Sequence, residues 1–218
     1  MIETNAHAAS IRRLARLALA GGGIFTVIVV LLHWIRPEYD VVTRFISEYA
    51  VTDPVLAAVA GVSLGLGSIA LAKALAAALP GEHRSRAGLL MMWTFGICFV
   101  GVGLFPADEF PTVNPPSWHG IIHAIFGLIG FFSFSLGSLL ISFRLRRAPS
   151  WRKDAPLLTV VAALCVILFF VFYAGLPFVG ILERILVALM IAWIGLVSRG
   201  LISGSSVSTV AQNFHTGS

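Results

Sequence analysis

The chain has 218 residues, of which 58% are hydrophobic and only 11% are charged, whereas soluble domains carry about 25% charged residues. This composition excludes a soluble globular protein. The net charge of +5 does not indicate nucleic-acid binding, because the basic residues are spread over several connections between apolar segments. Cys98 and Cys165 both lie inside apolar segments, which is typical of small buried hydrophobic side chains and not of a disulfide framework.

Six apolar segments account for nearly all of the chain. Each is close to the roughly 20 residues that a helix needs to cross a bilayer. The sequence therefore predicts an all-α fold, a bundle of six transmembrane helices. The helices are expected at about residues 17–35, 54–79, 87–105, 118–143, 156–176 and 178–197.

The predicted transmembrane domain, residues 17–199, lies between a short N-terminal segment, 1–16, and a tail, 200–218. The tail is rich in Ser, Gly and Thr, which predicts disorder. Asp53 before Pro54 predicts a helix start with Asp53 as the N-cap. Small residues in the second and fourth spans predict close helix packing, and they are Gly61, Gly65, Gly127, Gly130, Ser133 and Gly137.

The distribution of basic residues predicts the orientation in the membrane. The connections on the side of the N-terminus hold most of them, while the opposite side holds only Arg36 and Arg44 beside several acidic residues. The positive-inside rule therefore predicts that both termini are cytoplasmic. Trp34 and Trp118 are expected at the outer membrane interface and Trp151 at the inner one. The basic residues on the predicted inner side are Arg12, Arg13, Arg16, Arg84, Arg86, Arg144, Arg146, Arg147, Arg152, Lys153 and Arg199.

Two adjacent charged residues break the apolar pattern of the last span. The apolar segment between Arg184 and Arg199 is too short to cross a bilayer, so the helix must begin near Phe178. Glu183 and Arg184 then lie within the membrane, where a charge costs about 3 kcal/mol at the centre of a helix. Each is expected to face protein and to find a partner on another helix. They either form interhelical ion pairs or mark a functional site.

Three histidines are predicted at a similar depth on the outer side. His33 ends the first span, and His119 and His123 share one face of the fourth. Three histidines with an open position suit zinc, which would activate a water molecule. Asp108 or Glu48 would then accept its proton. The alternative is that interfacial histidines are structural and that His119 helps to cap its helix.

Several short motifs resemble an uncharacterised bacterial and archaeal membrane family known as domain of unknown function 998. They are Arg36-Pro37-Glu38-Tyr39-Asp40, Ile46-Ser47-Glu48-Tyr49-Ala50, Gly101-Val102-Gly103-Leu104-Phe105-Pro106-Ala107-Asp108, Gly120-Ile121-Ile122-His123 and Gly180-Ile181-Leu182-Glu183-Arg184. The resemblance implies six helices in a bacterial plasma membrane but no activity. His33 and His119 are not part of its pattern. The positions it marks as important are Asp40, Ser47, Glu48, Asp108, His123, Glu183 and Arg184.

Two further likenesses are fainter. The first loop is similar to that of Frag1/DRAM-like membrane proteins, some of which act in lipid remodelling. A set of Ser, Asp and two histidines four residues apart also resembles the alkaline ceramidase superfamily, although the number of helices differs.

These observations support three hypotheses. The leading one is a site at the outer leaflet that binds or hydrolyses a lipid head group. His123, Asp108, Glu48 and Ser47 would then be catalytic, and Arg184, with Glu183 and Asp40, would hold an anionic group. The second is a small proton-coupled transporter, and the third is a non-catalytic partner of another membrane protein. Membrane lipids and a membrane protein are thus the expected partners, and nucleic acid is not.

Overall fold

Six long helices make up the computed structural model, which describes residues 2–109 and 115–203. Each is long and apolar enough to cross a membrane, so the predicted all-α fold with six transmembrane helices is confirmed. The long helices are α1 (Ile2–Ile35), α3 (Pro54–Ala78), α4 (Arg86–Leu104), α5 (Trp118–Leu145), α6 (Ala155–Phe172) and α7 (Val179–Ile202). The connections contain the short helices η1 (Ile46–Glu48), α2 (Tyr49–Thr52), η2 (Gly81–His83) and η3 (Pro149–Trp151).

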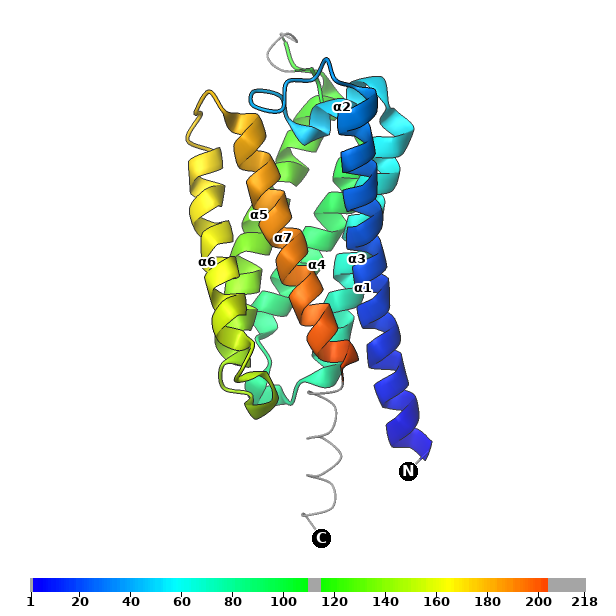
Figure 1. Cartoon of the computed structure of the whole chain (residues 1–218), viewed down its shortest axis with the longest axis vertical. Coiled ribbons are helices and arrows are strands. Elements are labelled where there is room, and N and C mark those ends of the chain that lie inside the picture. Colours follow the sequence, from blue (N-terminus) through cyan, green and yellow to red (C-terminus); the bar gives the residue numbers. More distant parts are fainter. Residues whose placement is uncertain (1, 110–114, 204–218) are drawn as a thin grey trace.

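The six long helices form a closed ring. Each packs against the next in the order α1, α3, α4, α5, α6 and α7, and α7 packs back against α1. Ile2 of α1 and Ile202 of α7 lie at the same end of the bundle, at the bottom of Figure 1. We call this the terminal end. The opposite end, which carries the connection of residues 36–53 and α2, we call the site end.

Three helix ends differ from the prediction. Helix α1 begins at Ile2 instead of near residue 17, because Ala, Leu and Arg in this stretch all favour a helix. Helix α6 ends at Phe172 instead of near residue 176, since Gly175 has a positive φ of 73° and Pro177 follows it. Helix α7 continues to Ile202, past the start of the predicted tail, and residues 204–218 lie outside the described residues.

Serine side chains cap two of the helices. Ser85 accepts a hydrogen bond from the Gly88 backbone N–H at 3.1 Å, and Ser117 accepts one from the Gly120 N–H at 3.0 Å. Asp53 occupies the N-cap position of α3, but its side chain makes no capping hydrogen bond. The prediction that its side chain caps the helix is wrong, because the carboxylate binds an arginine instead, as described below.

Glycines bring α3, α4 and α5 into close contact, as predicted. Gly61 of α3 faces Gly103 of α4, and Gly65 faces the carbonyl oxygen of Gly96. On α5, a side chain at Gly130 would meet Cys98 and Phe99 of α4, and one at Gly137 would meet Met91 and the backbone of Gly88. Gly127 is different, since a Cβ atom there would meet nothing within 4 Å. Its predicted packing role is wrong, because it faces an open space.

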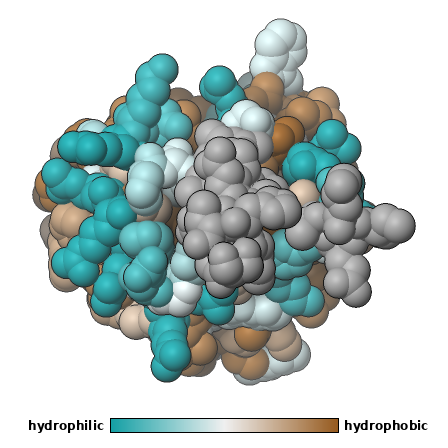
Figure 2. Space-filling model, turned by 90° about the horizontal axis from the view of Figure 1, so that it is seen from below, coloured by the Kyte–Doolittle hydropathy of each residue, from teal (hydrophilic) through white to brown (hydrophobic). Residues whose placement is uncertain are grey.

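The terminal end is hydrophilic. Figure 2 shows polar side chains gathered over this end of the bundle. The arginines of the connections between α3 and α4 and between α5 and α6 lie here. Trp151 also belongs to this end, but it is buried and its ring packs against Gly200. It is therefore part of the core, whereas Trp34 and Trp118 are exposed. The positions of the three side chains at the membrane interfaces stay predictions.

The contact between α3 and α4 makes a prediction about stability. In the variant Gly65→Ala the new methyl group would lie 2.5 Å from the Gly96 carbonyl oxygen. The helices must then separate, which we expect to lower the free energy of unfolding by about 1–3 kcal/mol. The matched control is Gly23→Ala, whose methyl group meets nothing within 4 Å. Thermal unfolding in detergent measures both variants, and equal stability would contradict this reading of the interface.

Candidate functional site

The connection between α1 and α3, residues 36–53, folds over the site end and is held by ion pairs of Arg36 and Arg44, and Arg44 also lies 3.4 Å from Glu109 before α5. Arg36 binds both carboxylate oxygens of Asp53, at 2.7 and 3.1 Å. Arg44 Nη1 lies 2.8 Å from Glu48 Oε2, and Glu48 Oε1 accepts a hydrogen bond from the Phe45 N–H. Glu48 is buried, so its partners make it a support for this connection and not a free base.

Asp40 lies at the exposed part of the same connection. Its carboxylate accepts hydrogen bonds from the Val42 N–H at 2.9 Å and from the Thr43 hydroxyl at 2.8 Å. These hydrogen bonds lower the pKa of Asp40 below its ordinary value. The side chain therefore organises the turn that it belongs to.

Helix α7 is fastened to this connection by its two intramembrane charges. Glu183 accepts a hydrogen bond from the Ile46 N–H at 2.5 Å. Arg184 donates from Nη1 to the Arg44 carbonyl oxygen at 2.7 Å and from Nε to His33 Nε2 at 2.8 Å. Neither side chain forms an ion pair with any described residue. The prediction of interhelical ion pairs is wrong, because Glu183 and Arg184 bind backbone groups and a histidine instead of opposite charges.

The hydrogen bonds of His33 fix its tautomer. A guanidinium group only donates hydrogen bonds, so His33 Nε2 accepts from Arg184. The proton then lies on Nδ1, which donates to the Val29 carbonyl oxygen at 2.6 Å. The ring also packs against Tyr49, with the two centroids 5.4 Å apart. Both nitrogens of His33 are therefore occupied.

The two histidines of α5 bind the end of α4. The Nδ1 atom of His119 lies 3.0 Å from the Pro106 carbonyl oxygen. The Nδ1 atom of His123 lies 2.7 Å from the Phe105 carbonyl oxygen. Because a carbonyl oxygen only accepts, each Nδ1 carries the proton. His119 therefore joins α5 to the end of α4, while Ser117 caps the helix.

Asp108 completes the start of α5. Its carboxylate accepts hydrogen bonds from the Ser117 hydroxyl at 2.6 Å and from the Ser117 N–H at 2.8 Å. The hydrogen bond from the Ser117 side chain is the largest influence that lowers the pKa of Asp108. Asp108 is therefore ionised near neutral pH, and it is committed to holding the Ser117 cap.

The structure does not form the predicted zinc site. No group of three or more His, Cys, Asp or Glu side chains that could hold a metal occurs among the described residues. His33 is bound to Arg184, while His119 and His123 bind two different carbonyl groups. The structure therefore does not bring His33, His119 and His123 together as the predicted set of zinc ligands.

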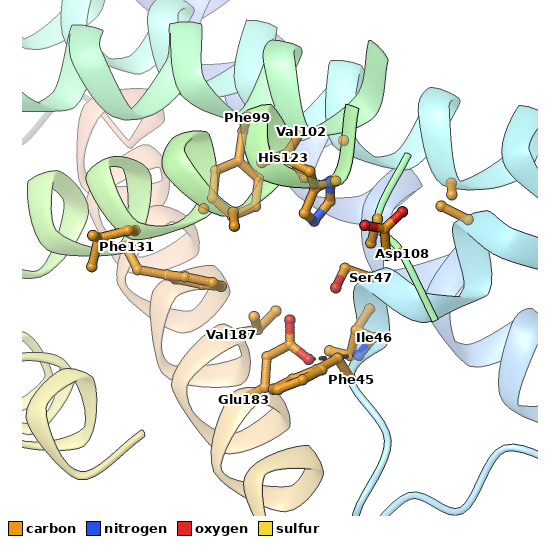
Figure 3. A pocket seen from close by; sticks show the side chains of 18 of the residues that line it. Phe45, Ile46, Ser47, Phe99, Val102, Asp108, His123, Phe131, Glu183 and Val187 are labelled. Carbon is orange, nitrogen blue, oxygen red and sulfur yellow. Dashed lines mark hydrogen bonds between the residues drawn. The ribbon is translucent and has the colours of Figure 1, made fainter. Parts of the chain in front are cut away.

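A cavity of about 720 Å³ lies within the site end of the bundle. Of the predicted site residues, it is lined by Ser47, Asp108, His123 and Glu183. Figure 3 shows a ring nitrogen of His123, the hydroxyl of Ser47 and one carboxyl oxygen of Glu183 directed into the same space. The predicted residues that do not line it are His33, Asp40, Glu48, His119 and Arg184.

Most of the cavity wall is apolar. Every long helix contributes to it, and most of its large side chains are phenylalanines. The ring of Phe172 packs against those of Phe45 and Phe131, with centroids 5.9 and 5.8 Å apart. Sequence reasoning missed these residues, because phenylalanine in a transmembrane helix gives no signal that separates a cavity wall from a lipid-facing surface. The phenylalanines of the wall are Phe25, Phe45, Phe99, Phe131 and Phe172.

Exposed residues of α5 that line the cavity indicate an opening beside the end of α6. Phe131 and Ala124 lie two turns apart on one face of α5, and both line the cavity. Phe131 is buried against Phe172, the last residue of α6, whereas Ala124 is exposed. Helix α6 therefore ends before it covers the first turns of α5. Ile121, Ile125 and Leu128 line the cavity and are also exposed at this opening.

These features define a multi-pass membrane protein with a cavity at one end of its helix bundle. The family model described as "Protein of unknown function (DUF998)" matches residues 19–200, and the chain belongs to this family. No curated protein and no solved structure gives a match. The likeness to Frag1/DRAM-like proteins stays a prediction.

The contacts of Arg184 make a prediction about stability. In Arg184→Lys a single ammonium group cannot reach both His33 Nε2 and the Arg44 carbonyl oxygen. One buried acceptor then loses its partner, which we expect to cost about 1–3 kcal/mol of unfolding free energy. Arg199→Lys, at an exposed position of the same helix, should change it by less than about 0.5 kcal/mol. Chemical unfolding in detergent measures both, and a loss no larger in Arg184→Lys than in Arg199→Lys would show that the contacts contribute little.

The lowered pKa of Asp108 makes a prediction about pH. Because folding lowers this pKa, the ionised carboxylate stabilises the protein above about pH 4, and this contribution is lost as the pH falls further. Asp108→Asn should therefore have a lower Tm than the wild type at neutral pH, and the difference should shrink in acid. The control Glu38→Gln changes an exposed carboxylate whose arginine contact is 3.8 Å long. If the Tm difference between Asp108→Asn and the wild type were the same at all pH values, the ionised Asp108 carboxylate would not be what stabilises the protein.

Proposed function

We propose that this protein binds a membrane amphiphile in the cavity at the site end. The observation that carries the proposal is the combination of one apolar cavity with polar atoms at a single edge. Binding sites for small molecules are typically apolar cavities of about 300–1,000 Å³ with a few polar groups that orient the ligand. The polar edge at Ser47, His123 and Glu183 suits a head group. The phenylalanine wall suits a hydrocarbon chain.

The lateral opening supports a ligand that comes from the bilayer. The residues around it, Ile121, Ile125 and Leu128, are apolar, and α5 is a membrane-spanning helix. A ligand entering there passes from hydrocarbon to an apolar wall without crossing water. The remaining part of a long chain can extend through the same opening into the membrane.

Binding is better supported than hydrolysis. A serine nucleophile needs a base within hydrogen-bond reach. Ser47 and His123 line the same cavity, but no hydrogen bond joins them in the described part of the chain. Asp108 is bound to Ser117, and Glu48 to Arg44 and the Phe45 N–H. Of the groups predicted to be catalytic, Asp108 and Glu48 are thus held in structural contacts, and Ser47 and His123 are not joined by a hydrogen bond.

Transport across the membrane is also less well supported. Phe95, Phe134 and Trp193 fill the middle of the bundle below the cavity and are fully buried. Phe134 packs against Phe95 and Trp193, with centroids 4.9 and 5.7 Å apart. The Trp193 N–H donates to Ser142 Oγ at 3.0 Å. This aromatic layer separates the cavity from the terminal end.

The proposal places the site in the outer leaflet of a bacterial plasma membrane. The terminal end carries most of the basic residues, and such residues favour the cytoplasmic side. The cavity lies at the opposite end, so its head-group edge faces the outer leaflet. Membrane lipids would then be the natural partners of the protein.

A variant that fills the cavity tests the proposal. A Cβ atom at Gly127 meets nothing within 4 Å, so Gly127→Leu places its side chain in free space on the cavity wall. We expect it to remove most of the lipid that co-purifies with the protein. The Tm should change by no more than about 4 °C, which corresponds to roughly 1 kcal/mol. Native mass spectrometry of protein in mild detergent measures the bound lipid.

The matched control is Gly23→Leu. Gly23 is exposed on α1, does not line the cavity and also has nothing within 4 Å of its Cβ position. This variant should retain the lipid of the wild type. Equal lipid content in the two leucine variants, or no bound lipid in the wild type, would count against a binding site in the cavity.

A further inference from the structure

We infer that the ligand of this cavity has a head group that donates hydrogen bonds and carries no negative charge, namely a hydroxyl or an amine. The inference rests on the proposed function, because it assumes that an amphiphile occupies the cavity. It replaces the expectation that Arg184 binds an anionic group such as a phosphate. The reason is the kind of polar atom that the cavity wall presents.

The charged residues of the wall are acidic. Asp108, Glu109 and Glu183 line the cavity, and no Lys or Arg is among its described lining residues. Arg184 is on the same helix as Glu183 but does not line the cavity. Its Nε and Nη1 atoms are engaged by His33, the Arg44 carbonyl and the Gly180 carbonyl, and its Nη2 atom is buried without a hydrogen-bond partner among the described residues. The wall would therefore offer a phosphate or carboxylate acidic groups and no Lys or Arg. Arg44, which does not line the cavity, lies 3.4 Å from Glu109.

Glu183 presents a free hydrogen-bond acceptor to the ligand. One of its carboxyl oxygens accepts from the Ile46 N–H, and Figure 3 shows the other directed into the cavity. The side chain is buried and lies within a membrane-spanning helix. A buried carboxyl group needs hydrogen-bond partners. A hydroxyl or an ammonium group of a ligand would supply one.

His123 presents a second acceptor. Its Nδ1 proton is used by the Phe105 carbonyl oxygen. In the neutral ring Nε2 has no proton and can only accept. Figure 3 shows a nitrogen of this ring facing the cavity. Glu183 lies across the cavity from it, and Ser47 lies at one side of the space between them. Since Glu183 and His123 both offer acceptors, the matching ligand must provide the protons.

Four probes with the same oleyl chain test this inference, namely oleyl alcohol, oleylamine, oleic acid and oleyl phosphate. Binding to the full-length protein in mild detergent at neutral pH is measured by native mass spectrometry. We expect the alcohol or the amine to bind at least about ten-fold more tightly than the acid and the phosphate, the difference that one hydrogen bond to a charged group makes. Tighter binding of the acid or the phosphate would overturn the inference.

A substitution at Glu183 identifies which donor is bound. Glu183→Gln keeps an oxygen for the Ile46 N–H and removes the charge. If the ligand is an amine, its affinity should fall about ten-fold, because the charge-assisted hydrogen bond is lost. If it is an alcohol, its affinity should change less than about three-fold, since a hydroxyl oxygen can accept a hydrogen bond from the amide NH2 group that then faces the cavity. Glu38→Gln, at an exposed position of the connection, is the control.

The outcomes separate this inference from the proposed function. If no probe binds, or if Gly127→Leu leaves binding of the favoured probe unchanged, the cavity is not a binding site and the proposed function fails. If all four probes bind with equal affinity and Gly127→Leu abolishes binding, the site stands and the head-group inference fails.

Discussion

The structure depends on one set of hydrogen bonds, those that fasten α7 to residues 36–53. Glu183 and Arg184 are adjacent, so they leave the helix in different directions and reach different parts of this connection. Glu183 holds the Ile46 N–H, and Arg184 holds His33 and the Arg44 carbonyl. Both residues lie within a transmembrane helix, where a charge needs partners because little water is available. The connection is therefore held in place by the two charged residues whose insertion into the membrane costs free energy.

This attachment also creates the cavity. Residues 45–47 are held above the centre of the ring, and they close its site end without filling it. Helix α6 ends early at Phe172, which leaves the first turns of α5 uncovered on one side. Below the cavity, the side chains of Phe95, Phe134 and Trp193 fill the centre of the bundle and are fully buried. The space is thus bounded above by polar contacts, below by aromatic rings and on one side by the membrane.

Most of the unusual polar residues serve the architecture of the site end. Asp108, His33 and His119 each hold two segments together through hydrogen bonds to serine, arginine or backbone carbonyls. Glu48 supports the connection of residues 36–53 through Arg44 and the Phe45 N–H. A few polar atoms are left to face the cavity, and they belong to Ser47, His123 and Glu183. A small number of polar groups in an apolar space favours recognition of a ligand over a hydrolytic centre.

The sequence by itself determined the six spans, the packing role of Gly61 and Gly65 and the burial of Glu183, because hydropathy, small residues and helix length are local properties. It also placed Ser47, His123 and Glu183 at one end of the bundle. Only the tertiary structure decided their partners. Glu183 binds the backbone of Ile46, 137 positions away, and a backbone N–H has no signature in a sequence. His33 binds Arg184 and is not part of a zinc site. The sequence did not show this, since a histidine near a membrane surface gives the same sequence pattern whether it binds a metal or an arginine. The cavity likewise arose from where α6 stops relative to α5, a relation between helices that no single segment encodes.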